Sequence, residues 1–193
     1  MKTMKVFVLF ILAGIILLAC SNPQQEAAEQ ITVLEDTLFS EEGNMNNLDK
    51  AMELINQYIS YADQFPEDSN SAEYLFKAAD IGMNINKGEL AIDLYNRIIQ
   101  TYPSFRKAPE CLFLKAYVYE NNLGQLNKAR VFYQEFIDKY PDNDFADDAE
   151  ISIQNLGKSP EELIREFEEK MKAQEAAQSY YTIEDCTLLG KVD

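Results

Sequence analysis

Two segments of the chain follow one pattern, and this repetition limits the fold more than any other feature. Ala91 to Pro103 (AIDLYNRIIQTYP) and Ala129 to Pro141 (ARVFYQEFIDKYP) each begin with Ala, carry Tyr four residues later and end in Tyr-Pro. Each predicts a helix with one apolar face that ends sharply, because proline cannot continue a helix. A weaker copy ends at Pro66, so the three prolines are 37 and 38 residues apart. A period of this length indicates stacked helical hairpins.

The segment before each repeated helix is repeated as well, which gives every unit two helices. Within residues 71–85 and 109–123 the two segments align at an offset of 37, with Ala72 against Pro109. Both place a small residue, Ala79 or Ala116, where two helices must approach closely. Glycine-containing turns join the two helices of each unit, at residues 86–88 and 123–125.

Apolar residues at helical spacing predict further helices outside these units. They cover residues 26–40, 48–65 and 145–156. We expect Asp144 to be the N-cap of the last of these. A capping box at residues 159–162, with Pro160 at the first helical position, begins one more helix with a narrow apolar face. We expect this helix to cap the stack, because a terminal helix needs only one apolar side.

The N-terminus has the pattern of an export signal. Lys2 and Lys5 precede an unbroken apolar run from Val6 to Ala19, which is too short to span a bilayer comfortably. The run ends in Leu-Leu-Ala-Cys, which resembles the lipobox of bacterial lipoproteins. The resemblance implies that Cys20 becomes the mature N-terminus and is the lipid attachment site, with an uncleaved transmembrane anchor as the alternative. Ser21 after the cysteine implies delivery to the outer membrane.

These segments give the expected domain organisation. It consists of a signal peptide at residues 1–19, a polar tether at 20–25, a helical domain at 26–178 and a flexible tail at 179–193. The tail lacks a helical period, and chain termini are usually mobile unless they are tied down. A strip that docks back onto the stack is the alternative.

The composition excludes several functions. The chain has 33 acidic and 17 basic residues, a formal net charge of -16, so no nucleic-acid partner is expected, because phosphate contacts need clustered Lys and Arg. It has no histidine, which removes Ser-His and Cys-His catalytic pairs and His-containing zinc sites. The sequence also lacks a glycine-rich phosphate loop. We therefore predict that the protein is not an enzyme and holds no metal or cofactor.

The repeated residues resemble the tetratricopeptide-repeat (TPR) family. In each unit the resemblance rests on a small residue, an alanine, an aromatic residue and a proline: Ala79, Ala91, Tyr95 and Pro103, then Ala116, Ala129, Tyr133 and Pro141. It implies an all-α fold, a right-handed superhelical stack of antiparallel helix hairpins with about three repeats and a C-terminal capping helix. Leu75 and Leu112 stand where the family usually has a large aromatic residue.

A lipobox followed by long TPR units that end in Tyr-Pro looks most like the TPR lipoproteins of the bacterial outer membrane. These include the BamD/YfiO-like assembly lipoproteins and the YbgF-like periplasmic proteins. The resemblance implies a lipid-anchored, periplasm-facing scaffold that binds other proteins or peptide segments, with an outer-membrane assembly machine as the expected partner. The alternative is an accessory factor that coordinates peptidoglycan or division machinery through oligomerisation.

In TPR proteins the first helices line a concave binding face. The corresponding positions here are Phe76, Asp80, Met83 and Asn84, then Phe113, Tyr117, Glu120 and Asn121, then Ile151 and Asn155, with Glu73, Glu110 and Asp148 beside them. Aromatic residues there would anchor a peptide, and amides would bond its backbone. The alternative is that Phe76 and Phe113 pack between helices while Asn84 and Asn121 cap them. The cations that bind a terminal carboxylate in clamp-type TPR proteins are missing, so that mode is not expected.

Two cysteines remain besides Cys20. Cys111 falls on a helix that is expected to be buried, and Cys186 falls in the tail. They would form a disulfide only if the tail docked at one specific place, so free thiols are the favoured prediction.

Overall fold

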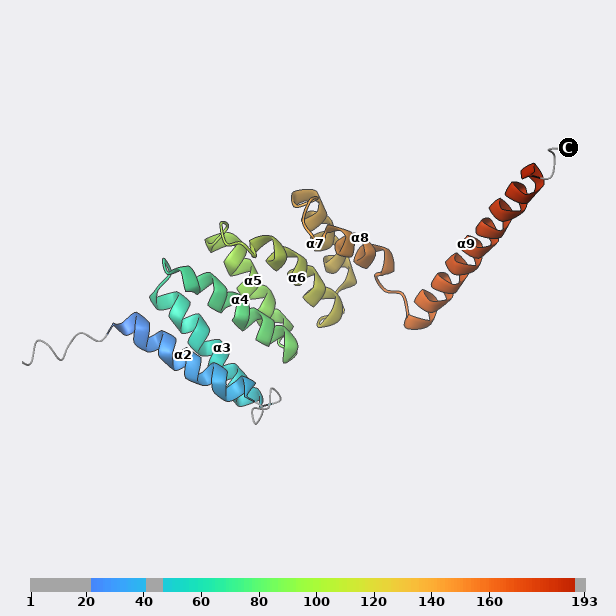
Figure 1. Ribbon diagram of the computed structural model, residues 1–193. Coiled ribbons are helices and arrows are strands. Elements are labelled where there is room, and N and C mark those ends of the chain that lie inside the picture. The colour runs from blue at the N-terminus through green and yellow to red at the C-terminus, as the bar shows by residue number, and fades with distance from the viewer. Residues whose placement is uncertain (1–21, 41–46, 190–193) are drawn as a thin grey trace, which may run out of the picture.

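The computed structural model describes residues 22–40 and 47–189, with side chains in those ranges as far as Glu175. All regular elements in this part of the chain are helices. They are α2 (Pro23–Phe39), α3 (Leu48–Gln64), α4 (Ser69–Asn84), α5 (Gly88–Thr101), α6 (Ala108–Asn121), α7 (Leu126–Lys139), α8 (Ala146–Asn155) and α9 (Pro160–Leu189). From α2 to α8, each helix packs on the next along the chain (Figure 1). The predicted fold, a helical repeat solenoid of about three hairpins, is therefore confirmed.

The second helix of every hairpin ends in the same backbone conformation, as the repeated prolines predict. The residues before the three prolines have φ between -125 and -135° and ψ between 56 and 59°. The N–H of each still donates to the carbonyl four residues earlier. The proline that follows has no N–H with which to continue the helix.

The core runs through the stack as two connected clusters of buried side chains. The first joins α2 to α6, and the second joins α6 to α8. Ile99 and Tyr119 pack against both, so the apolar interior is continuous. Tyr95 and Tyr133 are fully buried, which confirms the repeat register that predicted them as core residues.

Ion pairs join corresponding helices of successive hairpins. Lys77 of α4 lies 2.7 Å from Glu35 of α2, and Arg97 of α5 lies 2.7 Å from Asp63 of α3. First helices are thus paired with first helices, and second helices with second helices. We call the surface formed by α2 and α4 the first-helix face.

The turns inside the hairpins use different residues for the same backbone bend. Asn86 has φ of 60° between α4 and α5, and Gly124 has φ of 62° between α6 and α7. Gly88 instead begins α5 and is buried. A Cβ there would lie 3.1 Å from atoms of Val118, Asn122 and Leu123. Gly88 therefore allows close packing, not the left-handed turn that a recurring glycine predicts.

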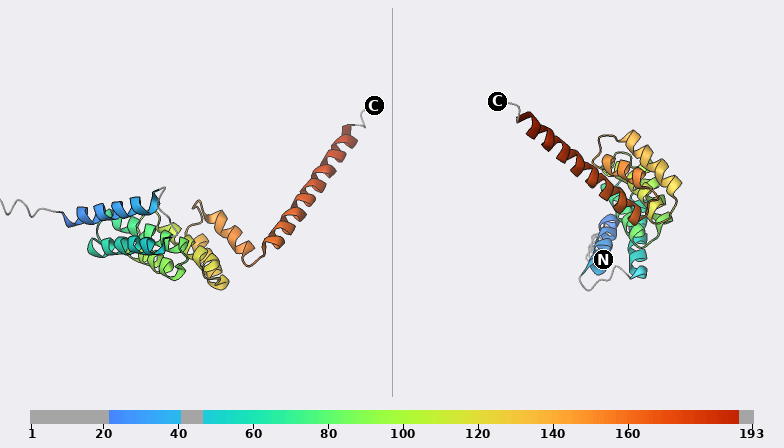
Figure 2. Two further views of the ribbon diagram at one scale, coloured as in Figure 1. Left: turned by 90° about the horizontal axis from the view of Figure 1, so that it is seen from below. Right: turned by 90° about the vertical axis from the view of Figure 1, so that its right-hand side faces the viewer.

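The prediction that the last helix caps the stack is wrong. Helix α9 makes no extensive contact with another described helix, and it extends away from the stack in all views (Figures 1 and 2). Three of its apolar residues are exposed: Phe167 at 65%, Ile164 at 60% and Met171 at 41% of their accessible surface. The capping box that begins it is confirmed: the Ser159 N–H donates to Glu162, and the Glu162 N–H donates to the Ser159 hydroxyl.

The side chains at the end of the stack explain why α9 does not fold back. Buried alanines allow the helices of the α6–α7 hairpin to approach, Ala116 on one and Ala129 on the other. The residues 38 positions later are Gln154 and Phe167, which are too large for the same approach. Arg130 stands 38 positions after the buried Ile92, and its guanidinium donates to the Ile153 carbonyl of α8. A charged side chain, that of Arg130, therefore occupies a position that is apolar and buried in the preceding hairpin.

Three predicted boundaries also differ from the structure. Helix α2 begins at Pro23 because Asn22 caps it, so part of the expected tether is helical. Helix α8 begins at Ala146 after Phe145, and Asn143, not Asp144, accepts a side-chain bond from the Phe145 N–H. Helix α9 continues to Leu189, through most of the segment that was predicted to be a tail without helix. The leader and Cys20 lie outside the described residues.

In the part of the chain that the structure describes, no helix has both the length and the apolar character needed to span a bilayer.

Candidate functional site

A pocket of about 670 Å³ opens between α2 and α4 on the first-helix face. Its walls are formed by Glu35, Asp36 and Phe39 of α2, the C-cap residue Ser40, Tyr58 of α3, and Lys77, Asp80, Ile81 and Asn84 of α4. It lies where the first two hairpins meet, so both must be in place to form it.

An ion pair and a tyrosine hold one side of this pocket. The Lys77 ammonium donates to Glu35 at 2.7 Å, and the Tyr58 hydroxyl donates to the same oxygen at 2.6 Å. Burial alone would raise the pKa of Glu35, but the hydrogen bonds from Lys77 and Tyr58 outweigh it and hold that pKa below its usual value. Glu35 is therefore ionised and already neutralised by Lys77.

The other side carries a carboxylate without a cation bonded to it. The Asp80 carboxylate accepts a hydrogen bond from the Tyr95 hydroxyl at 2.7 Å. Burial raises the pKa of Asp80 above its ordinary value, and the bond from Tyr95 only partly compensates. The charge of Lys107 acts to lower this pKa, but Lys107 is itself bonded to Glu73 at 2.9 Å.

A buried tyrosine bonded to a first-helix carboxylate occurs once in each hairpin. Tyr58 donates to Glu35, Tyr95 to Asp80, and Tyr133 to Glu120 at 2.8 Å. Burial, together with the carboxylate, raises the pKa of all three tyrosines, so the hydroxyls remain protonated donors. The register of the hairpins thus fixes the position of each carboxylate.

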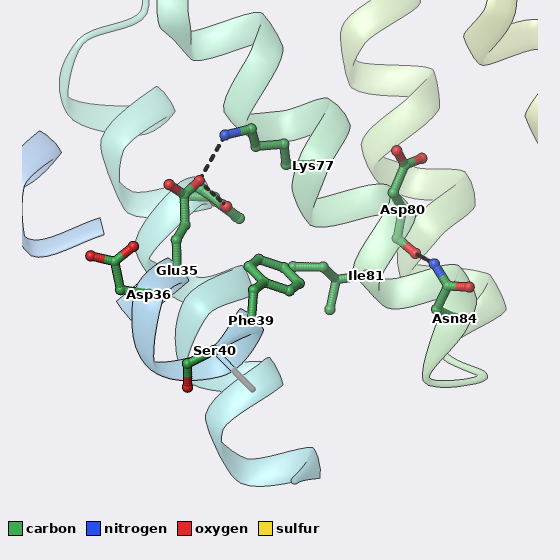
Figure 3. Close-up of a pocket in the computed structure, with 9 residues that line it drawn as sticks. Glu35, Asp36, Phe39, Ser40, Lys77, Asp80, Ile81 and Asn84 are labelled. Atoms are coloured by element: carbon green, nitrogen blue, oxygen red, sulfur yellow. Dashed lines mark hydrogen bonds and ion pairs between the residues drawn. The ribbon is translucent and has the colours of Figure 1, made fainter. Parts of the chain in front are cut away.

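Apolar side chains lie between the carboxylates. Figure 3 shows Phe39 and Ile81 next to each other, with Glu35 and Asp36 on the α2 side and Asp80 on the α4 side. Phe39 is 53% exposed, whereas Ile81 is buried. An exposed aromatic ring beside polar groups in a pocket is typical of a surface that binds other proteins.

Two predicted aromatic anchors serve the fold instead. Phe76 is buried, with its ring 6.1 Å from Tyr95 and 6.2 Å from Phe105. Phe113 is half-buried and stacks on Phe145 at 5.2 Å. The packing alternative therefore holds for both residues.

The remaining predicted groove residues are divided between the pocket and other places. Only Asp80 and Asn84 line the pocket. Met83 packs on the first core cluster, and Tyr117 and Ile151 are exposed outside the pocket lining. Asn84 and Asn121 are the last residues of α4 and α6, and each side-chain amide donates to the carbonyl four residues earlier. Asn155, likewise, is the last residue of α8.

One signal in the sequence pointed to the part of the site that was missed. The groove prediction started at α4 and omitted α2, which supplies three of the pocket residues. Phe39 follows Leu38 and falls off the apolar stripe of Ile31, Leu34 and Leu38. A large aromatic residue on the polar side of a helix was the available indication of a binding surface.

Metal binding and thiol chemistry find no support among the described residues. No group of acidic or cysteine side chains in this part of the chain is arranged to hold a metal ion. Cys111 is a buried free thiol, and burial raises its pKa, which makes it a poor nucleophile. The side chain of Cys186 is outside the described set, so the prediction about a disulfide stays a prediction.

Residues 110–143 match the sequence profile of the family described as tetratricopeptide repeat. This match covers nearly all of α6, the whole of α7 and the Tyr-Pro that ends it. A search of curated proteins finds no match. Proteins with this repeat are generally non-catalytic modules that bind other proteins or peptides.

Proposed function

We propose that this tetratricopeptide-repeat protein is a lipid-anchored, non-catalytic scaffold of the bacterial cell envelope. The stack binds a segment of another protein on its first-helix face, and a lipid on Cys20 holds it at the outer membrane, facing the periplasm. An outer-membrane assembly machine is the partner that the resemblance favours.

The pocket between α2 and α4 carries the binding proposal. It combines an exposed aromatic ring, fixed carboxylates and a volume of about 670 Å³, within the range of pockets that bind ligands. Two of the carboxylates in its walls, Glu35 and Asp80, are held by buried tyrosines. A pre-organised surface of this kind loses little entropy when a partner binds.

The sequence before the stack supports the anchor. Cys20 follows an apolar run of the length of a signal-peptide core, and Asn22 already caps the first helix. The lipid would therefore hold the first hairpin, and with it the pocket, close to the membrane. Two or more acyl chains are needed for stable anchoring, and a lipoprotein cysteine supplies them.

Co-purification from detergent-solubilised membranes tests the binding role. The change Phe39→Ser should remove most of the recovered partner, because a buried aromatic anchor commonly contributes about 2 kcal/mol or more, roughly thirtyfold in affinity. The matched control is Val33→Ser, which alters another exposed apolar residue of α2, 64% exposed and outside the pocket. Equal recovery from both variants, with the fold intact by circular dichroism, would exclude the pocket as the binding site.

A further inference from the structure

The charges of the pocket are not balanced. Its lining includes the carboxylates of Glu35, Asp36 and Asp80 but only one ammonium, that of Lys77. Lys77 forms an ion pair with Glu35, so the charges of these two residues cancel. Asp36 is exposed and, within residues 22–40 and 47–175, forms no ion pair, while Asp80 is bonded only to the neutral Tyr95 hydroxyl. Two negative charges therefore remain.

The apolar part of the pocket lies between these two charges. Phe39 and Ile81 are side by side, with Asp36 on the α2 side and Asp80 on the α4 side (Figure 3). A Lys or Arg side chain has the matching shape, because its methylene stem packs on apolar surface while its charged end stays at the rim. The exposed ring of Phe39 also attracts a cation placed over its face.

We infer that the occupant of this pocket is a basic segment of the partner protein, with an apolar residue next to a Lys or Arg side chain. The inference rests on the proposed function and adds the chemistry of the partner to it. The charged end of that Lys or Arg lies at the rim of the pocket, where Asp36 and Asp80 supply the unbalanced negative charge, and the apolar residue packs on Phe39 and Ile81. Asp80 is ionised in the complex, because a cation beside it offsets the burial that raises its pKa when the pocket is empty.

Selection of random peptides displayed on phage against the purified full chain tests this inference without assuming a sequence. The isosteric double variant Asp36→Asn with Asp80→Asn removes both charges, and the amide oxygen introduced at position 80 would still accept the bond from Tyr95. The matched control, Asp93→Asn with Asp142→Asn, removes the same total charge from exposed positions outside the pocket.

Peptides that bind the wild-type chain should be enriched in an apolar residue beside Lys or Arg. A selected peptide should bind the pocket variant about tenfold more weakly than the wild type, and the control variant within about twofold of it. Acetylation of the peptide's lysines should cause a similar loss.

Three results would overturn the inference. Selected peptides without Lys or Arg would show that the pocket takes another chemistry, while a protein-binding function would stand. Equal weakening by both double variants would show that only the overall negative charge attracts the peptides. Failure to select any peptide would count against the inference and against the proposed function together.

Discussion

Three tyrosines on the second helices, Tyr58, Tyr95 and Tyr133, connect the core to the first helices of the hairpins. Their rings fill the space between the helices of a hairpin, and their hydroxyls hold Glu35, Asp80 and Glu120 in place. The repeat pattern predicted the tyrosines, because their spacing from each proline is fixed. It did not predict their partners, since the three carboxylates come from unequal positions along the first helices. The same side chain thus stabilises the fold and positions a charge.

Removing one hydroxyl should separate these two contributions. Tyr95→Phe keeps the ring but deprives a half-buried carboxylate of its donor, so the free energy of unfolding should fall by about 1.5–3 kcal/mol. Tyr95→Ala should cost about 3–5 kcal/mol, because it also leaves a cavity. Urea unfolding measures both, with Tyr117→Phe as the exposed control that should change it by less than about 0.5 kcal/mol. A neutral Tyr95→Ala variant would contradict the repeat register.

The Lys77–Glu35 pair predicts a pH dependence. The pKa of Glu35 in the folded protein is below its ordinary value of 4.5, so its ionised form stabilises the fold. This stabilisation is complete above pH 4.5 and is lost as the pH falls through the folded pKa. Lys77 is 42% exposed, so solvent screening limits the effect to about 0.5–1 kcal/mol.

Comparison of the wild type with Glu35→Gln isolates this effect, because the other carboxylates are common to both proteins. The difference in the free energy of unfolding between them should be present at about pH 7 and should shrink below pH 4.5. A difference that stays constant down to about pH 3 would show that Glu35 does not bear its charge as the structure indicates.

At the level of the helices, the sequence predicted those helix ends that a single residue or short motif determines. Proline determined where α3, α5 and α7 end, and the capping box determined where α9 begins. The docking of α9 could not be predicted from its narrow apolar face alone. It depended on the bulk of Gln154 and Phe167 at a close-approach position and on Arg130 at the end of the stack. Whether the side chains of two helices fit together can be judged only when the positions of both helices are known.

Helix α9 should therefore be dispensable for the stability of the stack. Ending the chain after Ser159 should change the free energy of unfolding by less than about 0.5 kcal/mol, because no extensive packing is lost. Ending it after Pro141 also removes α8, uncovers the second cluster and should destabilise the protein strongly. Urea unfolding followed by tyrosine fluorescence distinguishes the two. A loss of about 2 kcal/mol or more from the first truncation would mean that α9 does pack on the stack.

For the molecule as a whole, the periodicity of the sequence predicted the fold class and the number of repeats. It predicted only part of the candidate binding site. Asp80 and Asn84 were predicted to lie in the groove and do line the pocket. Phe39 was missed, because a single aromatic residue outside the apolar stripe carries no periodic signal. The lipid anchor remains a proposal that rests on the leader sequence.

Changing Cys20→Ala tests the anchor. Only a cysteine thiol can take the lipid at the end of this leader, so the variant should accumulate as a precursor with its leader uncut. Immunoblotting of membrane and soluble fractions reads out both size and location. A variant that is still processed to the mature size and still found in the membrane would refute the lipobox interpretation.

Whether a partner protein occupies the pocket between α2 and α4 can be determined in intact cells. A photo-crosslinking amino acid placed at position 39 would report what touches the pocket, and the same amino acid at position 33 would report on the same helix outside it. We predict a discrete higher-mass product that contains a second protein from position 39, and none from position 33. A product from position 33 alone, or equal products from both positions, would contradict the assignment of the pocket as the binding site.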